Sequence, residues 1–211
     1  MKLNPNKSPG PDEHHPLILK ELIHEISLPL SIVFTKCIAE KYIPQSWREA
    51  NVTALFKKGN KSNPCNYRPV SLTSIICKLL ESVIKDKIFR HMELNKLFSA
   101  NQNGFIKGRS CSTNLLAVMD KWTESLDLRL PVDTIYLDFA KAFDSVPHKR
   151  LLLKLQKYGI NGQVLNWIKE FLGNRRQYVK IKNTKSKWAP VTSGIPQVKC
   201  SWTLSFCYIY K

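Results

Sequence analysis

Beyond its midpoint, the 211-residue chain reads Ile135-Tyr136-Leu137-Asp138-Phe139-Ala140-Lys141-Ala142-Phe143-Asp144. Residues 132–137 are mostly β-branched, aromatic or aliphatic, and the run is too short for a helix, so it predicts a buried strand. The strand would end at Asp138, whose carboxylate oxygens are hard ligands of the kind that Mg²⁺ takes alongside substrate phosphates. Taken alone, an aspartate at a strand end is more often a turn or helix-capping residue.

Four further sequence blocks occur in the chain, three before this stretch and one after it. They read Lys7-Ser8-Pro9-Gly10-Pro11-Asp12, Asn66-Tyr67-Arg68-Pro69-Val70-Ser71-Leu72-Thr73-Ser74, Gln102-Asn103-Gly104-Phe105-Ile106-Lys107-Gly108-Arg109-Ser110 and Thr192-Ser193-Gly194-Ile195-Pro196-Gln197. Together with the central block and Val146-Pro147-His148, they resemble, in content and order, the reverse transcriptases of jockey-like non-LTR retrotransposons. The central block resembles the first palm motif of that family, and residues 192–197 resemble the start of its second.

The expected fold class is α+β. Apolar periodicity predicts helices over 17–26, 30–42, 75–92, 110–126, 149–158 and 163–172, a strand over 51–56, and a hairpin of 177–182 with 188–191. The resemblance implies a polymerase right hand, with fingers over 1–130 and a partial palm over 131–197. Its ferredoxin-like palm sheet would be incomplete.

The resemblance also implies roles for individual residues. Asp138 would be the catalytic metal ligand for Mg²⁺ in nucleotidyl transfer, and Asp144 a turn or capping residue. Contacts with the incoming nucleotide are implied for Arg68, Phe143, Gln197 and one or more of Lys57, Lys58 and Lys61. Contacts on the template side are implied for Gln102, Gly104, Phe105, Gly108 and Arg109. The alternatives are a core phenylalanine at 143 and an ordinary solvated basic turn over 57–61.

The net charge points to a polyanionic partner. Lys and Arg number 33 against 16 Asp and Glu, a formal charge of +17. Residues 175–187 carry six basic side chains and no acidic one, so we expect Arg175 and Arg176 to contact nucleic-acid phosphates. In the family the partners are an RNA template and a DNA primer. A solvated basic surface is the alternative.

The sequence shows no sign of secretion, membrane insertion or zinc binding. No apolar stretch approaches the length of a transmembrane helix, and the N-terminus lacks a signal-peptide core. The six cysteines lack zinc-type spacing. We expect an intracellular protein with reduced thiols, in either the nucleus or the cytoplasm.

The resemblance stops inside the second palm motif. The family's third palm motif carries two adjacent aspartates, but this sequence contains no Asp-Asp pair, and Glu170 is its last acidic residue after Asp144. Residues 199–206 can be encoded by bases that, read one nucleotide later, give Asn-Val-Leu-Gly-Pro-Phe-Leu-Phe, close to the family's continuation. We therefore expect a truncated domain with a frameshifted tail over 198–211.

These observations predict an inactive part of an RNA-directed DNA polymerase from a mobile element. Two alternatives stay open, a non-catalytic module that binds RNA or DNA and a pseudogene relic without function. A nuclease using Asp138 and Asp144 would leave the blocks at 66–74 and 102–110 unexplained.

Overall fold

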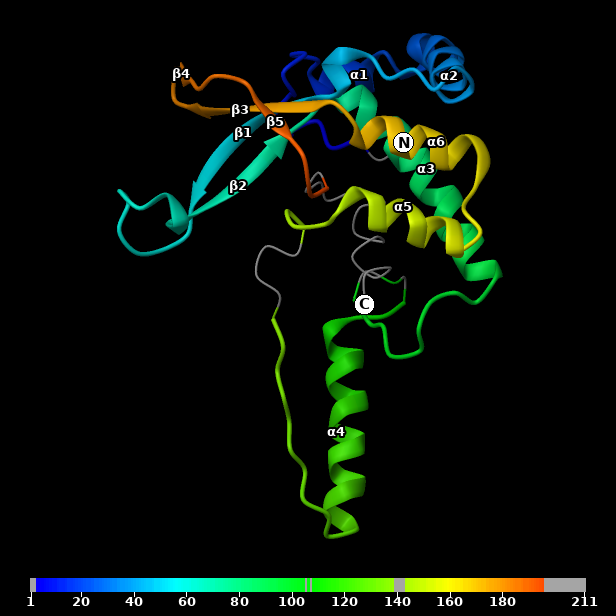
Figure 1. Cartoon of the computed structure of the whole chain (residues 1–211), viewed down its shortest axis with the longest axis vertical. Helices are drawn as coiled ribbons and strands as arrows, with labels where there is room; N and C mark the ends of the chain where they lie inside the picture. Colours follow the sequence, from blue (N-terminus) through cyan, green and yellow to red (C-terminus); the bar gives the residue numbers. More distant parts are fainter. Residues whose placement is uncertain (1–2, 105, 107, 139–142, 196–211) are drawn as a thin grey trace.

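The computed structural model describes residues 3–104, 106, 108–138 and 143–195 (Figure 1). The helices are α1 (Pro16–Glu21), α2 (Ile23–Ala39), α3 (Ile75–Leu94), α4 (Cys111–Asp127), α5 (His148–Lys157) and α6 (Gly162–Leu172), with short 3₁₀ turns at Gln45–Trp47 and Pro64–Asn66. The strands are β1 (Glu49–Phe56), β2 (Tyr67–Leu72), β3 (Arg175–Ile181), β4 (Thr184–Lys185) and β5 (Ala189–Val191). The fold is a mixture of helices and one small mixed sheet, which agrees with the expected class at that level.

The sheet joins strands that are far apart in the sequence. β1 pairs antiparallel with β2 and parallel with β3, and β3 pairs antiparallel with both β4 and β5. The parallel register places Glu49 opposite Arg176 and Val52 opposite Val179. One sheet therefore contains strands from both the predicted fingers region and the predicted palm region.

The two faces of the sheet carry different side chains, because successive residues of a strand point to opposite sides. Asn51 pairs with Leu72 and with Tyr178, so these three residues share one face, which we name the Tyr178 face. Val52 pairs with Ser71 and lies on the opposite face, which we name the Val52 face.

The hydrophobic core lies among α2, α3, α5 and α6. In α3 the buried side chains Leu80, Ile84 and Ile88 recur every four residues and form one helix face. They belong to the same cluster as Leu151 of α5 and Trp167 of α6, each fully buried. Since the cluster combines α2 and α3 with α5 and α6, the boundary at 130/131 does not separate two cores.

The N-terminal block packs against the end of the second block. A Cβ on Gly10 would lie 2.6 Å from the carbonyl carbon of Thr73, so only glycine allows this approach. Ser74, the next residue, caps α3 by accepting a hydrogen bond from Cys77 N. The glycine thus fixes residues 8–13 beside the start of α3.

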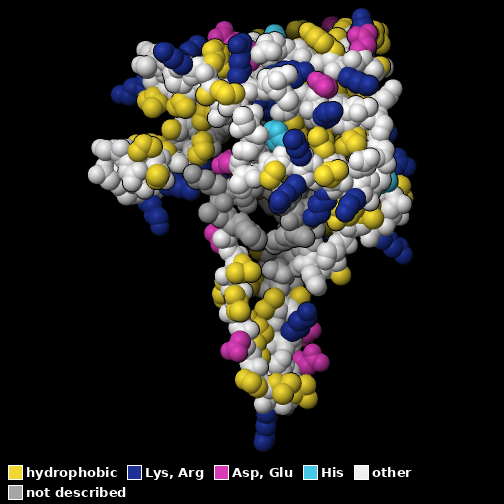
Figure 2. All heavy atoms as spheres, viewed as in Figure 1, with side chains coloured by type: hydrophobic (Ala, Val, Ile, Leu, Met, Phe, Trp, Pro, Cys, Tyr) yellow, Lys and Arg dark blue, Asp and Glu magenta, His cyan; other side chains and the backbone are white. Residues whose placement is uncertain are grey.

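Helix α4 and residues 128–138 extend away from the rest of the protein (Figure 1). We name them the arm. No residue of α4 is buried, and apolar side chains are visible along both the helix and the returning segment (Figure 2).

The prediction of a buried strand over 132–137 is wrong. Ile135, Tyr136 and Leu137 are more than 80% exposed, and no described residue pairs with this segment as a strand. The physical reason is that an extended segment becomes a strand only when a neighbour satisfies its N–H and C=O groups. The described sheet offers it no such neighbour.

One helix boundary differs from its prediction, and one strand has no counterpart among the predictions. The break expected between residues 26 and 30 falls instead at Leu22, and Pro29 lies inside α2. The strand β2 was not predicted. The remaining helices and the β3–β5 hairpin occur within a few residues of the predicted ranges. Within the described ranges, no helix has both the length and the apolar character required to span a membrane.

Candidate functional site

The end of the central block and the start of the last block are hydrogen-bonded to each other. Ile195 N donates to Phe143 O at 3.0 Å, and Gly194 N donates to Val146 O at 3.0 Å. The Ser193 hydroxyl donates to Asp144 O at 3.0 Å, and His148 Nε2 lies 2.7 Å from Gly194 O. The structure therefore brings together the two blocks that resemble palm motifs.

Gly194 is required at this junction for two reasons. Its φ of +80° lies in the left-handed region, which side chains other than glycine rarely adopt. A Cβ there would also lie 2.7 Å from the carbonyl oxygen of Asp144. The glycine thus lets the two segments approach at backbone distance.

A cavity of about 330 Å³ opens beside this junction, on the Val52 face of the sheet. Ala50 and Val52 of β1, Ser71 of β2 and Gln177 of β3 contribute to its wall. Asp144 and residues 190–195 close its other side. Its volume is at the lower end of the range for small-molecule sites. Asp144 thus lines the cavity. It lies in a turn, as the sequence predicts, and its backbone carbonyl accepts the hydrogen bond from the Ser193 hydroxyl.

Asp138 is exposed and is the last residue of the arm, at the end that returns to the rest of the protein (Figure 1). Residues 139–142, which follow it, lie outside the described residues. Among the described residues no three His, Cys, Asp or Glu side chains gather closely enough to hold a metal ion. The described donor set therefore does not fit a complete magnesium site, and Asp138 supplies a single carboxylate.

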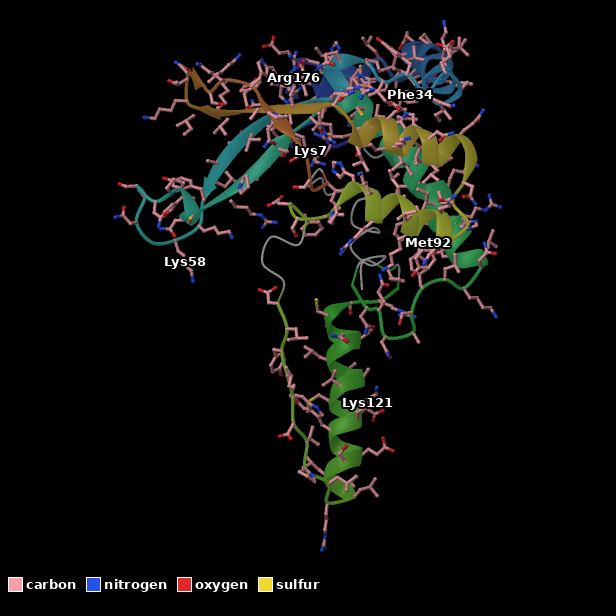
Figure 3. All side chains as sticks on the ribbon, viewed as in Figure 1. Lys7, Phe34, Lys58, Met92, Lys121 and Arg176 are labelled. Atoms are coloured by element: carbon pink, nitrogen blue, oxygen red, sulfur yellow. The ribbon has the colours of Figure 1, made fainter. Side chains whose placement is uncertain are left out.

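The basic residues expected at the incoming nucleotide lie on the β1–β2 ribbon. Arg68 is exposed on β2, and Lys57, Lys58 and Lys61 are exposed on the loop that joins the strands. None of them lines the cavity, and Lys58 lies at the far end of the ribbon from Arg176 (Figure 3). These four basic residues therefore do not share the cavity that Asp144 lines.

The third block forms a loop held by Arg109. Its guanidinium donates to the carbonyls of Ser99, at 3.1 Å, and Ala100, at 2.8 Å, and also to Gln102 O. Gly108 has a φ of +80° with open space around it, and Gly104 is exposed. Arg109 thus has a structural role in this loop, and the template contact that we expected of it stays a prediction.

Arg175 is buried and lines the cavity at the palm-like junction, so its contact with nucleic acid stays a prediction. It is 6% exposed, and its guanidinium carbon lies 4.9 Å from the centre of the Phe171 ring. Burial lowers the pKa of Arg175, while the buried Glu81 carboxylate and the Cys77 thiol counteract that shift. The guanidinium thus contacts the core through Phe171 and Glu81 and also borders the cavity.

Arg176, the next residue, points to the other side of the sheet and is exposed. It forms an ion pair with Glu49 and lies over the Trp188 ring, 4.6 Å from the ring centre. Phe143 packs partly buried against the core, which was its alternative reading. Phe105 and Gln197 lie outside the described residues. His148, Ser193 and Gly194 were quoted only as parts of blocks, and their joining role was not predicted.

Comparison with known proteins identifies the family. The sequence profile of "Reverse transcriptase (RNA-dependent DNA polymerase)" matches residues 56–205, which include most of the described chain and part of the tail that we expected to be frameshifted.

Curated relatives come from insect mobile elements. The probable RNA-directed DNA polymerase from transposon X-element of Drosophila melanogaster is 29% identical over 96% of this chain and 22% of the relative. The RNA-directed DNA polymerase from mobile element jockey of the same species is 26% identical over 93% of the chain and 21% of the relative. The retrovirus-related Pol polyprotein from type-1 retrotransposable element R1 of Bradysia coprophila is 28% identical over 90% of this chain and 19% of the relative. This chain spans about a fifth of their lengths, and it belongs to the reverse transcriptase family of non-LTR retrotransposons.

Proposed function

We propose that these residues contribute the template, primer and nucleotide contacts of a mobile-element reverse transcriptase, and that by themselves they bind nucleic acid without polymerising. The observation that carries the proposal is the hydrogen-bonded junction of the two palm-like blocks beside a cavity of about 330 Å³. The formal charge of +17 supports a nucleic-acid partner.

The residue roles in this proposal follow the family match. Asp138 would be the metal ligand, and Arg68 with Lys57, Lys58 or Lys61 would bind the triphosphate. Phe143 and Gln197 would contact the nucleotide, and the loop held by Arg109 would contact the template. In the family Mg²⁺ would activate the primer hydroxyl and stabilise the leaving pyrophosphate.

Inactivity is proposed because the chain supplies too few carboxylates. Two-metal nucleotidyl transfer requires several oxygen ligands around ions about 3.5–4 Å apart. After Asp144 the sequence offers only Glu170, whose carboxylate lies 3.5 Å from the Arg48 guanidinium. Asp138 therefore has no carboxylate partner from this part of the chain.

A primer-extension assay tests the inactivity. With oligo(dT) annealed to poly(rA), dTTP and Mg²⁺ or Mn²⁺, we expect no incorporation above that of the Asp138→Asn variant. Extension by the unaltered chain that Asp138→Asn abolishes would contradict the proposal.

Fluorescence anisotropy with a labelled RNA–DNA hybrid tests the binding. We expect affinity that falls steeply as salt rises, because each phosphate contact releases a counterion. Absence of binding at low salt would overturn this part of the proposal.

The frameshifted tail is a separate proposal. Residues 198–211 lie outside the described residues, and the family match reaches residue 205. Sequencing the genomic locus and its transcript beyond the Gln197 codon tests it. We expect a one-base shift to restore Val-Leu-Gly-Pro, and uninterrupted family coding in the present frame would refute it.

A further inference from the structure

A second pocket lies on the Tyr178 face of the sheet, opposite the cavity at the palm-like junction. It measures about 400 Å³ and is lined by residues 8–11 and 13 of the N-terminal segment and by Asn51 and Thr53 of β1. Leu72, Tyr178, Lys180, Lys182 and Lys185 complete the lining. We propose that this pocket binds a phosphate of single-stranded nucleic acid, with a neighbouring base stacked on Trp188.

The charge of the pocket favours an anion. Three of its lining side chains are lysines, and Glu13 is its one acidic lining residue among the described positions. No described carboxylate forms an ion pair with any of the three lysines. Because three neighbouring ammonium groups repel one another, a bound phosphate lowers the energy of the cluster.

Two further lining residues provide neutral polar groups. Asn51 and Thr53 lie on the same face of β1 and line the pocket beside the lysines. Carboxamide and hydroxyl groups can donate hydrogen bonds to phosphate oxygens, so the pocket offers more than charge.

Aromatic side chains beside the pocket favour a nucleic acid over a free anion. Tyr178 lines the pocket, and its ring centre lies 4.7 Å from that of Trp188, edge to face. Trp188 is 43% exposed and has Arg176 over its ring. Single-stranded nucleic acids bind where cations follow the backbone and exposed rings stack with bases. Arg176, labelled in Figure 3, belongs to this same cluster.

The strand register separates this site from the cavity at the junction. Asn51, Thr53, Tyr178 and Lys180 alternate with Ala50, Val52 and Gln177, whose side chains line the other cavity. Substitutions on the Tyr178 face therefore leave the Val52 face unchanged. This separation lets one experiment distinguish the two proposals.

The test compares two triple variants that each remove three positive charges. The first is Lys180→Gln/Lys182→Gln/Lys185→Gln, and the control is Lys149→Gln/Lys157→Gln/Lys169→Gln on exposed positions of α5 and α6. Binding is measured by anisotropy with labelled 12-mers of oligo(rU) and oligo(dT) and with an RNA–DNA hybrid duplex. Melting temperatures of all variants establish that they fold.

We expect the first triple variant, and not the control, to bind single strands more weakly. Its slope of log K against log salt should shrink by about 0.7, the value for one lost phosphate contact on a single strand. Trp188→Ala should weaken binding about tenfold, and Trp188→Phe should retain most of the affinity. Comparison of the affinities for oligo(rU) and oligo(dT) shows whether the pocket prefers RNA or DNA.

Equal loss in both triple variants, or no loss in either, would overturn the proposal. Binding of the hybrid duplex should persist in the first triple variant, because it uses the other face. If the unaltered chain binds single strands through these lysines but does not bind the hybrid, the proposed function fails and this inference stands.

Discussion

Gly194 connects two sequence blocks through its backbone alone. We predict that Gly194→Ala lowers the free energy of unfolding by about 3 kcal/mol, because it combines a strained φ with a collision against Asp144. Thermal or urea unfolding measures the change.

Gly162→Ala is the matched control for this substitution. Gly162 also has a positive φ, +66°, but a Cβ there meets no atom within 4 Å. Gly162→Ala should lower the free energy of unfolding by only about 1 kcal/mol, which is the cost of the strained backbone without a collision. Equal costs at the two positions would show that the collision with Asp144 does not matter.

The buried charges of Arg175 and Glu81 stabilise each other. We predict that Arg175→Met or Glu81→Met alone destabilises the protein by about 3 kcal/mol, because each removes a buried opposite charge from the other residue, with Lys78 left as the remaining positive charge near Glu81. The double variant should be closer to the unaltered protein than either single variant. A double-mutant cycle by urea unfolding measures the coupling, and additive costs would contradict it.

Cys77 should be the least reactive of the described thiols. Burial raises its pKa well above the ordinary 9.0, and the Glu81 carboxylate raises it further. A pKa raised in the folded state stabilises the protein below the ordinary value, and this contribution is lost as pH rises above about 9. We predict that thiol reagents at pH 8 modify the exposed Cys65 and Cys111 first.

The variant used for this measurement is Cys200→Ser/Cys207→Ser, which removes the two cysteines outside the described residues. Mass spectrometry of digested samples locates the label. In urea all four remaining thiols should react at similar rates. Rapid labelling of Cys77 in the folded protein would contradict the prediction.

At the scale of elements, helices were predicted better than strands because their signals are local. The i, i+4 apolar repeat of α3 and the apolar faces of α5 and α6 lie within each segment. A strand also depends on its neighbours. β2 has an exposed Arg68-Pro69 pair and no clear alternation, yet it forms against β1. Residues 132–137 show a stronger strand signal and have no described partner.

The arm provides a prediction at this scale. Ile135→Lys and Leu137→Lys together should leave the melting temperature unchanged, because both side chains are more than 80% exposed. They should also lower aggregation, since they interrupt an exposed apolar strand-like segment. Light scattering and thermal unfolding measure the two effects.

Leu151→Lys, at a fully buried position of α5, is the comparison for the arm variant. It should unfold the protein, because it places an unpaired charge in the core. Substantial destabilisation by the arm substitutions would mean that the arm packs against the rest of the chain in solution.

At the scale of the whole molecule, the predicted regions share one sheet and one core cluster. β1 pairs with β3, and the core combines Leu80 of α3 with Leu151, Trp167 and Phe171. We predict that residues 1–130 and 131–211, produced separately, show no cooperative unfolding, whereas the whole chain does. Circular dichroism during urea titration measures this. A cooperative transition in either half would contradict the prediction.

The candidate site was predictable to the extent that its residues belong to motifs. The family blocks located the two segments that meet at Gly194, but not the hydrogen bonds that join them. The roles expected of Asp138 and Arg68 stay predictions. The burial of Arg175 beside the exposed Arg176 could not be predicted from composition, because it depends on which sheet face covers α3. The pocket on the Tyr178 face needed the register of β1 with β3.

The parallel pairing of β1 with β3 also determines when this protein can fold on the ribosome. Glu49 and Arg176, which form an ion pair across the two strands, are 127 residues apart in the chain. At about 5–20 residues per second, β1 leaves the ribosome roughly 6–25 s before its partner. During that interval the β1–β2 ribbon presents an unpaired edge to other nascent chains. A host that translates this stretch slowly, or lacks chaperones that cover strand edges, should accumulate insoluble product even though the finished fold is sound.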